Sequence, residues 1–317
     1  MNKQLSIAIP TFNRLAIFKK NLMDTMRLVR PYNIPIYISD DSDNDRIKNL
    51  VKEVLEDYEY IFYSHNYPAL KHDLNYCRAL QLPQSDYVWL IGDSVKFNDK
   101  AIEKVLTVIE KSKPNIISVN AENRNIDNDE FISIDSNQVF NNFGWHLTYT
   151  GTTIFPRDAI EYSKNIDYSP FKNFPQIATV FCYLAKQCNF YWINDDLLVT
   201  DSKKISYWYQ ESFRTFIYDW ENAVHALPNN YDLSLKQKVI LDHSKESKIF
   251  SIRSLLKLKS YDAYNITILR SFRSSLLKHS GINIIVLILI ASISGSFVRK
   301  VADFFGAGRL RQTSLEE

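Results

Sequence analysis

The chain has 317 residues, a formal net charge of +2 and only 7 glycines, of which Gly92 is the first. It contains neither G-x-G-x-x-G nor G-x-x-x-x-G-K-[ST], which excludes a Rossmann dinucleotide site and a Walker-type phosphate loop. The three cysteines follow no disulfide or metal-ligand spacing and predict a reducing cytoplasm, and the N-terminal segment MNKQLSIAIP lacks the pattern of a signal peptide.

Residues 1–125 alternate short β-rich runs with amphipathic stretches. Apolar side chains recur at helical spacing in these stretches, as at Leu15, Phe18 and Leu22. The predicted strands are 5–10, 34–40, 60–64, 87–91 and 116–120, and the predicted helices are 15–30, 44–58, 74–82 and 101–111. This alternation predicts an α/β fold with a mostly parallel central sheet flanked by helices on both faces.

Residues 126–235 are less regular and form the second predicted part of the chain. The predicted strands in this part are 149–155 and 190–200, and the predicted helices are 174–186 and 211–226. No internal repeat and no low-complexity linker marks the boundary with the first part.

Residues 236–317 differ from the rest of the chain in charge. They carry 14 basic and 6 acidic residues, whereas residues 1–235 carry 24 basic and 30 acidic ones. Within them, Ser280–Val298 is a run of 19 residues without a charged side chain, and positive residues flank both ends. A membrane span needs about 20 predominantly apolar residues, so this run is close to the required length.

We predict that residues 262–311 are helical and associate with a membrane surface, because basic side chains there are attracted to anionic headgroups. A monotopic or re-entrant helix is the first interpretation, a single C-terminal span the second, and a buried helix or oligomer contact the third. The basic residues alternate with long aliphatic runs, which disfavours nucleic acid as a partner. The expected location is the cytoplasmic face of the inner (cell) membrane, as a peripheral protein or through that single span.

Ligands of parallel α/β sheets bind at the carboxyl ends of the strands. The residues directly after the predicted strands therefore matter most, and they are Thr11–Arg14, Asp40–Ser42, His65–Asn66 and Gly92–Ser94. The adjacent carboxylates of Asp40 and Asp41 are costly unless they pair or bind a ligand such as a base N–H or a ribose hydroxyl. The alternative is an Asp-Ser turn that caps the following helix. Asp93 can bind a ribose hydroxyl or a divalent metal, or can be an ordinary turn residue after glycine.

Four segments together carry a family resemblance. They are IAIPTFNR, the strand ending in ISDDS, NYPALKHDLNYCRAL and YVWLIGDS. In their order and spacing over about residues 3–125, they resemble the nucleotide-binding half of family 2 glycosyltransferases with the GT-A fold. TGTTIFPRD at 150–158 is similar to the acceptor-side strand and turn of that family. The resemblance implies a nucleotide-sugar-binding half at 1–125 and an acceptor-binding half at 126–235. The basic charge and the apolar run described above predict a basic helical membrane-associating region at 236–317. It is strongest to bacterial enzymes that build O-antigen or capsule repeats on lipid carriers.

The resemblance also implies roles for individual residues in the donor site. It implies that Pro10, Thr11 and Phe12 lie against the base and that Arg14 is near the base or the phosphates. It implies that Asp40 or, preferably, Asp41 hydrogen-bonds to the base. Near the nucleotide or donor sugar it implies Lys71, Asp73 and Asn75, and in the D-x-D region for ribose and metal it implies Asp93 with Ser94. Asn75 as a helix cap is the alternative to a ligand contact.

Two departures from the family pattern affect the expected chemistry. The D-x-D region has a single carboxylate, Asp93, so Mg²⁺ or Mn²⁺ is expected to bind weakly there or mostly through the donor diphosphate. The segment that matches the family's general base, Phe174–Gln176, has no carboxylate. An inverting transfer needs a base for the acceptor hydroxyl, and Asp167 is the predicted one, with Asp158 and His146 as alternatives.

The expected activity is an inverting transfer of a sugar from a nucleotide diphosphate donor to a lipid-linked saccharide. Two alternatives stay open at this point. A sugar nucleotidyltransferase shares the strand–helix alternation but is disfavoured by the missing early glycine-rich loop. A catalytically inactive nucleotide-binding scaffold would account for the reduced D-x-D region and the missing base.

Overall fold

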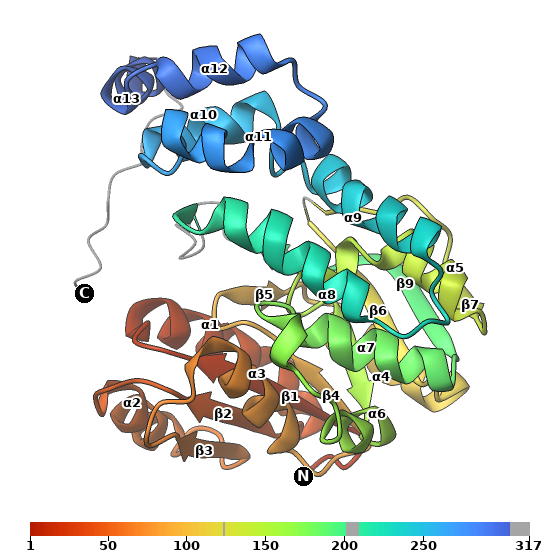
Figure 1. Ribbon diagram of the computed structural model, residues 1–317. Helices are drawn as coiled ribbons and strands as arrows, with labels where there is room; N and C mark the ends of the chain where they lie inside the picture. The colour runs from red at the N-terminus through yellow and green to blue at the C-terminus, as the bar shows by residue number, and fades with distance from the viewer. Residues whose placement is uncertain (123, 201–208, 305–317) are drawn as a thin grey trace. The chain divides into compact units, whose positions relative to one another are not determined.

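The structure is a computed structural model that describes residues 1–122, 124–200 and 209–304. The chain divides into two compact units. Unit 1 comprises Met1–Asp201 and Leu227–Tyr231, and unit 2 comprises Ser202–Ala226 and Asp232–Glu317. Figure 1 follows the chain through both units.

The described part of unit 1 is built on a nine-stranded sheet with the order β3-β2-β1-β4-β8-β6-β9-β5, and β7 pairs with β9. The strands are β1 (Leu5–Thr11), β2 (Ile36–Asp40), β3 (Ile61–His65), β4 (Tyr87–Leu90), β5 (Val95–Phe97), β6 (Ile116–Ala121), β7 (Phe131–Ser133), β8 (Thr153–Pro156) and β9 (Phe190–Thr200).

The sheet is mixed, so the prediction of a mostly parallel sheet was wrong. Strands β3, β2, β1 and β4 are parallel, as predicted, and β6 is parallel to β9. However, β8 runs antiparallel between β4 and β6, and β5 and β7 are both antiparallel to β9. The physical reason is that a helix crossing back over the sheet between consecutive strands keeps them parallel, which holds for β1 to β4 but not for the later strands.

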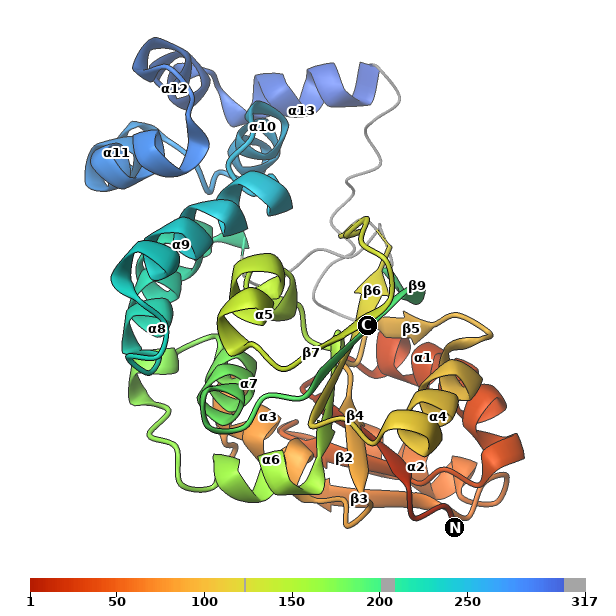
Figure 2. The same ribbon diagram turned by 90° about the vertical axis from the view of Figure 1, so that its right-hand side faces the viewer.

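Helices cover both faces of the sheet, as predicted. Figure 2 shows α1 and α4 on one face and α3, α6 and α7 on the other. The helices of unit 1 are α1 (Leu15–Val29), α2 (Arg46–Val54), α3 (Lys71–Gln81), α4 (Ala101–Ser112), α5 (Ser136–Phe143), α6 (Arg157–Ser163) and α7 (Pro175–Lys186). Short 3₁₀ turns lie at Arg30–Tyr32, His146–Thr148 and Ser169–Phe171.

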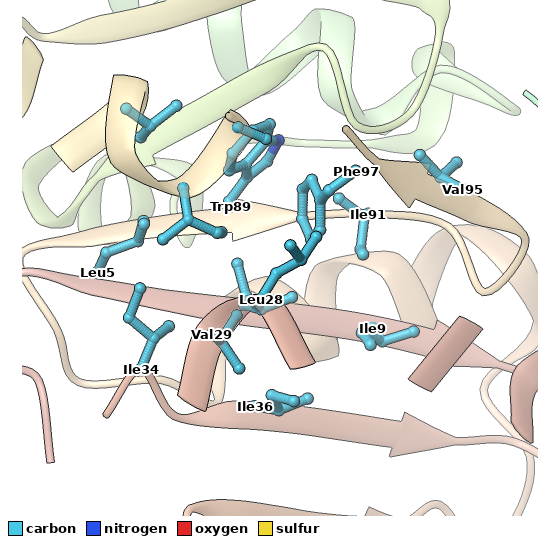
Figure 3. Close-up of a cluster of buried hydrophobic side chains, with 14 of the residues drawn as sticks. Leu5, Ile9, Leu28, Val29, Ile34, Ile36, Trp89, Ile91, Val95 and Phe97 are labelled. Carbon is cyan, nitrogen blue, oxygen red and sulfur yellow. The ribbon is translucent and has the colours of Figure 1, made fainter. Parts of the chain in front are cut away.

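One large apolar core fixes the first four strands in place. Figure 3 shows Val29 of α1 with Ile9 of β1, Ile36 of β2 and Trp89 of β4 in this cluster. Each of the four side chains is at most 3% exposed. Burial of a large apolar side chain contributes about 1.5–3 kcal/mol, so this core holds the strand ends, and the polar residues that follow them, in one rigid frame.

Unit 2 is helical in the residues that the structure describes. A π-helical turn at Arg214–Asp219 leads into α8 (Trp220–Ala226), and the remaining helices are α9 (Leu233–Ser247), α10 (Ile252–Ser260), α11 (Ile266–Ser280), α12 (Ile284–Ser292) and α13 (Gly295–Phe304). Phe213, Leu255 and Tyr264 belong to its own apolar core.

Among the described residues, no single helix has the length and apolarity needed to cross a membrane. Ile284–Ser292 and Gly295–Ala302 satisfy that test only as a pair, and they meet at an angle of 88°. Residues 305–311, the end of the predicted membrane-associated stretch, lie outside the described residues.

Candidate functional site

The carboxyl ends of β1, β2 and β4 meet at one edge of the sheet. Thr11 at the end of β1 pairs with Asp40 at the end of β2, and Ala8 of β1 pairs with Leu90 at the end of β4. The residues that follow these strands are therefore neighbours in space, as the parallel arrangement predicts.

Asp93, which follows β4, is the centre of one cluster at this edge. The Arg14 Nη1 atom lies 2.7 Å from Asp93 Oδ1, and the Thr11 hydroxyl donates to Asp93 Oδ2 at 3.4 Å. The Asn21 side chain of α1 donates to the Asp93 carbonyl at 2.9 Å. The side chain of Asp93 is only 8% exposed and that of Arg14 is 27% exposed, so the ion pair is shielded from water. Ser94 is buried beside them.

Asp40 is fully buried and bonds within the fold. Its Oδ1 atom accepts from the Ser42 amide at 2.9 Å, and its Oδ2 atom accepts from the Tyr63 hydroxyl at 2.8 Å. Oδ1 thus stabilises the turn after β2, and Oδ2 joins the end of β2 to β3.

Asp41 fixes the start of α3. Its Oδ1 atom accepts from the Leu70 amide and from the Asn66 side chain, both at 2.9 Å, and its Oδ2 atom accepts from the Lys71 amide at 2.6 Å. The alternative expectation was an Asp-Ser turn that caps the helix after β2, and Asp41 instead caps α3. A carboxylate here satisfies amides that the helix itself leaves without partners.

Asn75 joins α3 to the same edge. Its side-chain oxygen accepts from Asn66 at 3.1 Å, and its side-chain nitrogen donates to the Thr11 carbonyl at 3.2 Å. The side chain is buried, so Asn75 positions α3 against β1.

The first turn of α3 carries exposed polar groups. Lys71 is exposed and has a φ of +69°. The His72 Nδ1 atom lies 2.7 Å from Asp73 Oδ1, and the Asn173 amide donates to Asp73 Oδ2 at 2.9 Å. Asp73 thus links α3 to the loop before α7. His72 was not among the predicted site residues, and its only signal was its position next to Asp73.

The predicted base-contacting residues of β1 differ in exposure. Pro10 is partly buried and pairs with Ser39 of β2. Phe12 is 54% exposed, which leaves an aromatic face accessible at the carboxyl edge. Aromatic faces of this kind stack on flat rings.

The residues at Asp93 fit a divalent cation only together with phosphate oxygens. Within the described ranges, no group of three or more His, Cys, Asp or Glu side chains is placed to hold a metal ion. Mg²⁺ is commonly held by one or two carboxylates and by substrate phosphates, so Asp93 can contribute one ligand. Arg14 already pairs with that carboxylate and would compete with the cation.

The predicted acceptor-side carboxylates, Asp167 and Asp158, belong to other parts of unit 1 than the Asp93 cluster. Asp167 is exposed, and its two oxygens accept from the Ser169 amide and hydroxyl, both at 2.9 Å. These bonds lower the pKa of Asp167 and make it a weaker base. Asp158 is in the first turn of α6, after Pro156, which pairs with Tyr87 at the amino end of β4. Asp158 is therefore at the opposite edge from Asp93.

His146, in the 3₁₀ turn His146–Thr148, is fully buried. Its Nδ1 atom lies 3.1 Å from the Arg124 carbonyl oxygen, and its Nε2 atom lies 2.9 Å from the Val119 carbonyl oxygen. These two contacts favour the imidazolium, but burial and the Arg124 guanidinium outweigh them and lower the pKa of His146 to about 3. His146 is therefore a structural residue in this geometry.

A family model described as Glycosyl transferase family 2 matches residues 6–168, which include β2 to β8, all but the first residue of β1, and the donor-side cluster. The chain belongs to glycosyl transferase family 2. The expected family and glycosyltransferase class are thereby confirmed. No curated protein matches the chain by sequence.

Solved structures of glycosyltransferases share the fold of this family 2 member. S. aureus TarS 1–349 has a TM-score of 0.55 and 11% identity, and the match covers 97% of this chain and 93% of that one. The same TarS segment with UDP-GlcNAc has a TM-score of 0.55 and 10% identity over the same shares. The mannosyltransferase PcManGT from Pyrobaculum calidifontis, in complex with GDP-Man and Mn²⁺, has a TM-score of 0.57 and 10% identity, with 97% and 89% covered.

The site of this family 2 glycosyltransferase is one connected network at the edge. Thr11 joins its two parts, because its hydroxyl bonds Asp93 and its carbonyl accepts from Asn75. Arg14 and Lys71 supply positive charge at the starts of α1 and α3. Such an arrangement can bind a phosphorylated ligand and stabilise negative charge that develops on it.

Proposed function

We propose that the protein is an inverting glycosyltransferase that transfers a sugar from a nucleoside diphosphate donor to a hydroxyl of a lipid-linked saccharide. The process would be the biosynthesis of a surface polysaccharide such as O-antigen or capsule. The observation that carries the proposal is the Thr11–Arg14–Asp93 cluster at the carboxyl edge of a family 2 fold. The complexes of similar folds with UDP-GlcNAc and with GDP-Man support a nucleotide-sugar donor.

In the proposed donor site, Pro10 and Phe12 lie against the base, and Asp41 is close to it at the end of β2. Asp93 would bind the ribose or, together with the diphosphate, a divalent cation, beside Ser94. A bound cation would neutralise phosphate charge. Arg14 and Lys71 would stabilise the charge of the departing diphosphate, because preorganised cations act most strongly where charge develops.

The proposed reaction is a single displacement. The acceptor oxygen attacks the anomeric carbon from the side opposite the diphosphate, and the bond from that carbon to the phosphate oxygen breaks. The diphosphate keeps the electron pair, and the hydroxyl proton moves to a base. Asp167 stays the base predicted from the sequence, and Asp167→Asn tests it.

The proposed location is the cytoplasmic face of the cell membrane. Ile285, Ile288 and Leu289 lie on the exposed side of α12, whereas Leu287 and Ile290 on its other side are buried in unit 2. A helix that is apolar on all sides is typical of a protein core or a membrane. The exposed basic residues of α11 and α13, which would attract anionic headgroups, are Arg270, Arg273, Lys278, Arg299 and Lys300.

A transfer assay tests the proposed activity. Purified full-length protein is incubated with a panel of UDP-, GDP- and CDP-sugars and lipid-linked saccharide acceptors, with and without Mn²⁺. We expect one donor to give a glycosylated lipid with inverted anomeric configuration, and Asp93→Asn to lose that product. Failure of the wild-type protein to turn over any donor would refute the proposal, and tight binding of a nucleotide without turnover would support an inactive scaffold.

A further inference from the structure

Arg124 is a cation in the turn after β6 that lacks an acidic partner. The residue is partly exposed, although its Nε atom is enclosed and has no hydrogen-bond partner. Within the described residues, no carboxylate pairs with its guanidinium, and burial lowers the pKa of Arg124 to about 10. A charge that is largely removed from water is costly unless another group balances it. The position therefore favours an anion that the chain itself does not supply.

Neutral groups hold the guanidinium of Arg124 in place. Its Nη2 atom donates to the Trp145 carbonyl and, at 3.0 Å, to the Thr148 hydroxyl. Its central carbon lies 5.0 Å from the centroid of the Trp145 ring and 5.8 Å from that of the Tyr149 ring. These groups orient the cation without neutralising it. A planar guanidinium fixed in this way matches the geometry of a carboxylate or a phosphate.

Arg124 lies at the same edge of the sheet as the D-x-D region. Strands β4 and β6 both run antiparallel to β8, so their carboxyl ends point in the same direction. The loop before β8 runs beside the turn after β4, because a Cβ atom on Gly151 would lie 3.7 Å from the Ile91 side chain and 3.6 Å from the Val95 side chain. Tyr149, whose ring faces Arg124, precedes Gly151 by two residues.

The donor cluster and Arg124 lie on opposite sides of β4 in the sheet. The strand order is β1-β4-β8-β6, with Arg14 after β1 and Arg124 after β6. A single displacement brings the acceptor oxygen to the anomeric carbon from the side opposite the diphosphate. With the diphosphate proposed beside Arg14, the acceptor approaches from the direction of β8 and β6. Gln176, in the first turn of α7, donates to the Thr148 carbonyl at 2.8 Å and so links this place to the acceptor half.

We propose that Arg124 binds an anionic group of the acceptor, a carboxylate or a phosphate, and that the acceptor is therefore an acidic saccharide. This rests on the proposed function. An oxygen of the anionic group accepts from the guanidinium, and its negative charge balances a cation that the described residues leave without a carboxylate. Arg124 takes no proton in the reaction, because it already carries one. It selects the acceptor and positions the hydroxyl that attacks.

Binding of simple sugars tests the proposal without any transfer. The probes for the full-length protein are methyl glucuronide, glucose 6-phosphate and the neutral methyl glucoside, each titrated by NMR with excess UDP and, separately, with excess GDP. The nucleotide occupies the donor site, so the titration reports an anion site outside it. We expect the wild-type protein to bind at least one acidic probe about tenfold or more tightly than the neutral probe. The preferred acidic probe distinguishes a carboxylate from a phosphate.

Three variants separate anion binding from structure. Arg124→Gln should abolish the preference for the acidic probe. Arg124→Lys keeps the charge but not the planar fork, so it should reduce the preference, and it keeps the test decisive where the Gln variant does not fold. Arg157→Gln is the matched control, because Arg157 also donates to two backbone carbonyls but follows Pro156, which pairs at the amino end of β4. This control should keep the preference.

The transfer assay gives the second measurement. Arg124→Gln should raise the acceptor KM about tenfold or more and leave the donor KM unchanged. The proposal is overturned if the wild-type protein binds acidic and neutral probes alike or binds none of them, or if both Arg124 variants keep the preference. It is also overturned if Arg124→Gln weakens binding of UDP or GDP instead, which would place the cation at the donor diphosphate. If the wild-type protein shows the preference but transfers no sugar, the proposed function fails while the anion site stands.

Discussion

Arg14 and Asp93 form a shielded ion pair, with 2.7 Å between Nη1 and Oδ1, that joins the start of α1 to the turn after β4. The only carboxylate of the D-x-D region is thus bonded to a cation of the protein itself. The pair places a positive and a negative group at the edge where the donor is proposed to bind. Changes to either residue should therefore alter activity, stability or Mn²⁺ binding.

Asp93→Asn should affect activity more than stability. The change removes the charge that pairs with Arg14, and we expect kcat to fall by about 100-fold or more. The free energy of unfolding should fall by about 1–3 kcal/mol, since a hydrogen-bonded charge is lost from a mostly buried site. Denaturant titration and transfer assays check both values. Asp86→Asn is the matched control, because Asp86 is exposed just before β4, and an equal loss of activity there would contradict the assigned role of Asp93.

Binding of Mn²⁺ should depend on the diphosphate. Asp93 contributes one carboxylate and Arg14 competes for it, so the free protein should bind Mn²⁺ far more weakly than the protein with a nucleoside diphosphate. Electron paramagnetic resonance of Mn²⁺ measures this without any reaction. Arg14→Ala should strengthen binding of the ion alone. Tight Mn²⁺ binding by wild-type protein without nucleotide would show that other ligands complete the site.

Asp41→Asn should loosen the start of α3. An amide has one acceptor oxygen in place of two, so it cannot accept from Asn66, Leu70 and Lys71 together. We expect a loss of about 1–2 kcal/mol in the free energy of unfolding and faster amide exchange at Leu70 and Lys71. Asp43→Asn, an exposed neighbour, should leave both measurements unchanged. Identical exchange in the two variants would argue against the cap.

Unit 1 should lose stability in acid through His146. The pKa of this buried histidine is lowered to about 3, so between pH 6.5 and 3 the unfolded chain binds a proton that the folded protein does not. Stability should be fully present above pH 6.5 and fall by up to about 1.4 kcal/mol per pH unit below it. Denaturant titration from pH 8 to 4 measures the slope. His146→Gln should flatten it and His225→Gln should not, and a slope unchanged in His146→Gln would refute this account.

Membrane binding should depend on the exposed face of α12. The triple change Ile285→Ser, Ile288→Ser and Leu289→Ser removes side chains that are 64%, 45% and 59% exposed, so the fold should persist. We expect binding to anionic lipid vesicles to weaken by about tenfold or more. Leu233→Ser is the control, since Leu233 of α9 is 61% exposed elsewhere in unit 2. Equal sedimentation of the triple variant and the wild type with vesicles would exclude this surface.

The sequence alone was sufficient to predict the strands, the helices and the edge residues of the donor half of unit 1. Apolar periodicity predicts β1 to β4 with the helices between them, and the parallel rule then places Thr11, Arg14, Asp41 and Asp93 at one edge. The prediction works there because β1, β2 and β4 are buried on both faces and form short apolar runs, and because each connecting helix buries one side. The order and spacing of these segments also identify the family.

Only the tertiary structure decided the directions of the later strands, their pairing and the partners of the polar side chains. The direction of β8 and the pairing of the three-residue strands β5 and β7 depend on contacts between distant segments, and strands this short show no periodicity. Only the folded chain brings Asn173 to Asp73 and Leu70 to Asp41. Sequence spacing predicts which face of an element is buried, whereas the partner of a polar atom is determined by how distant elements pack together.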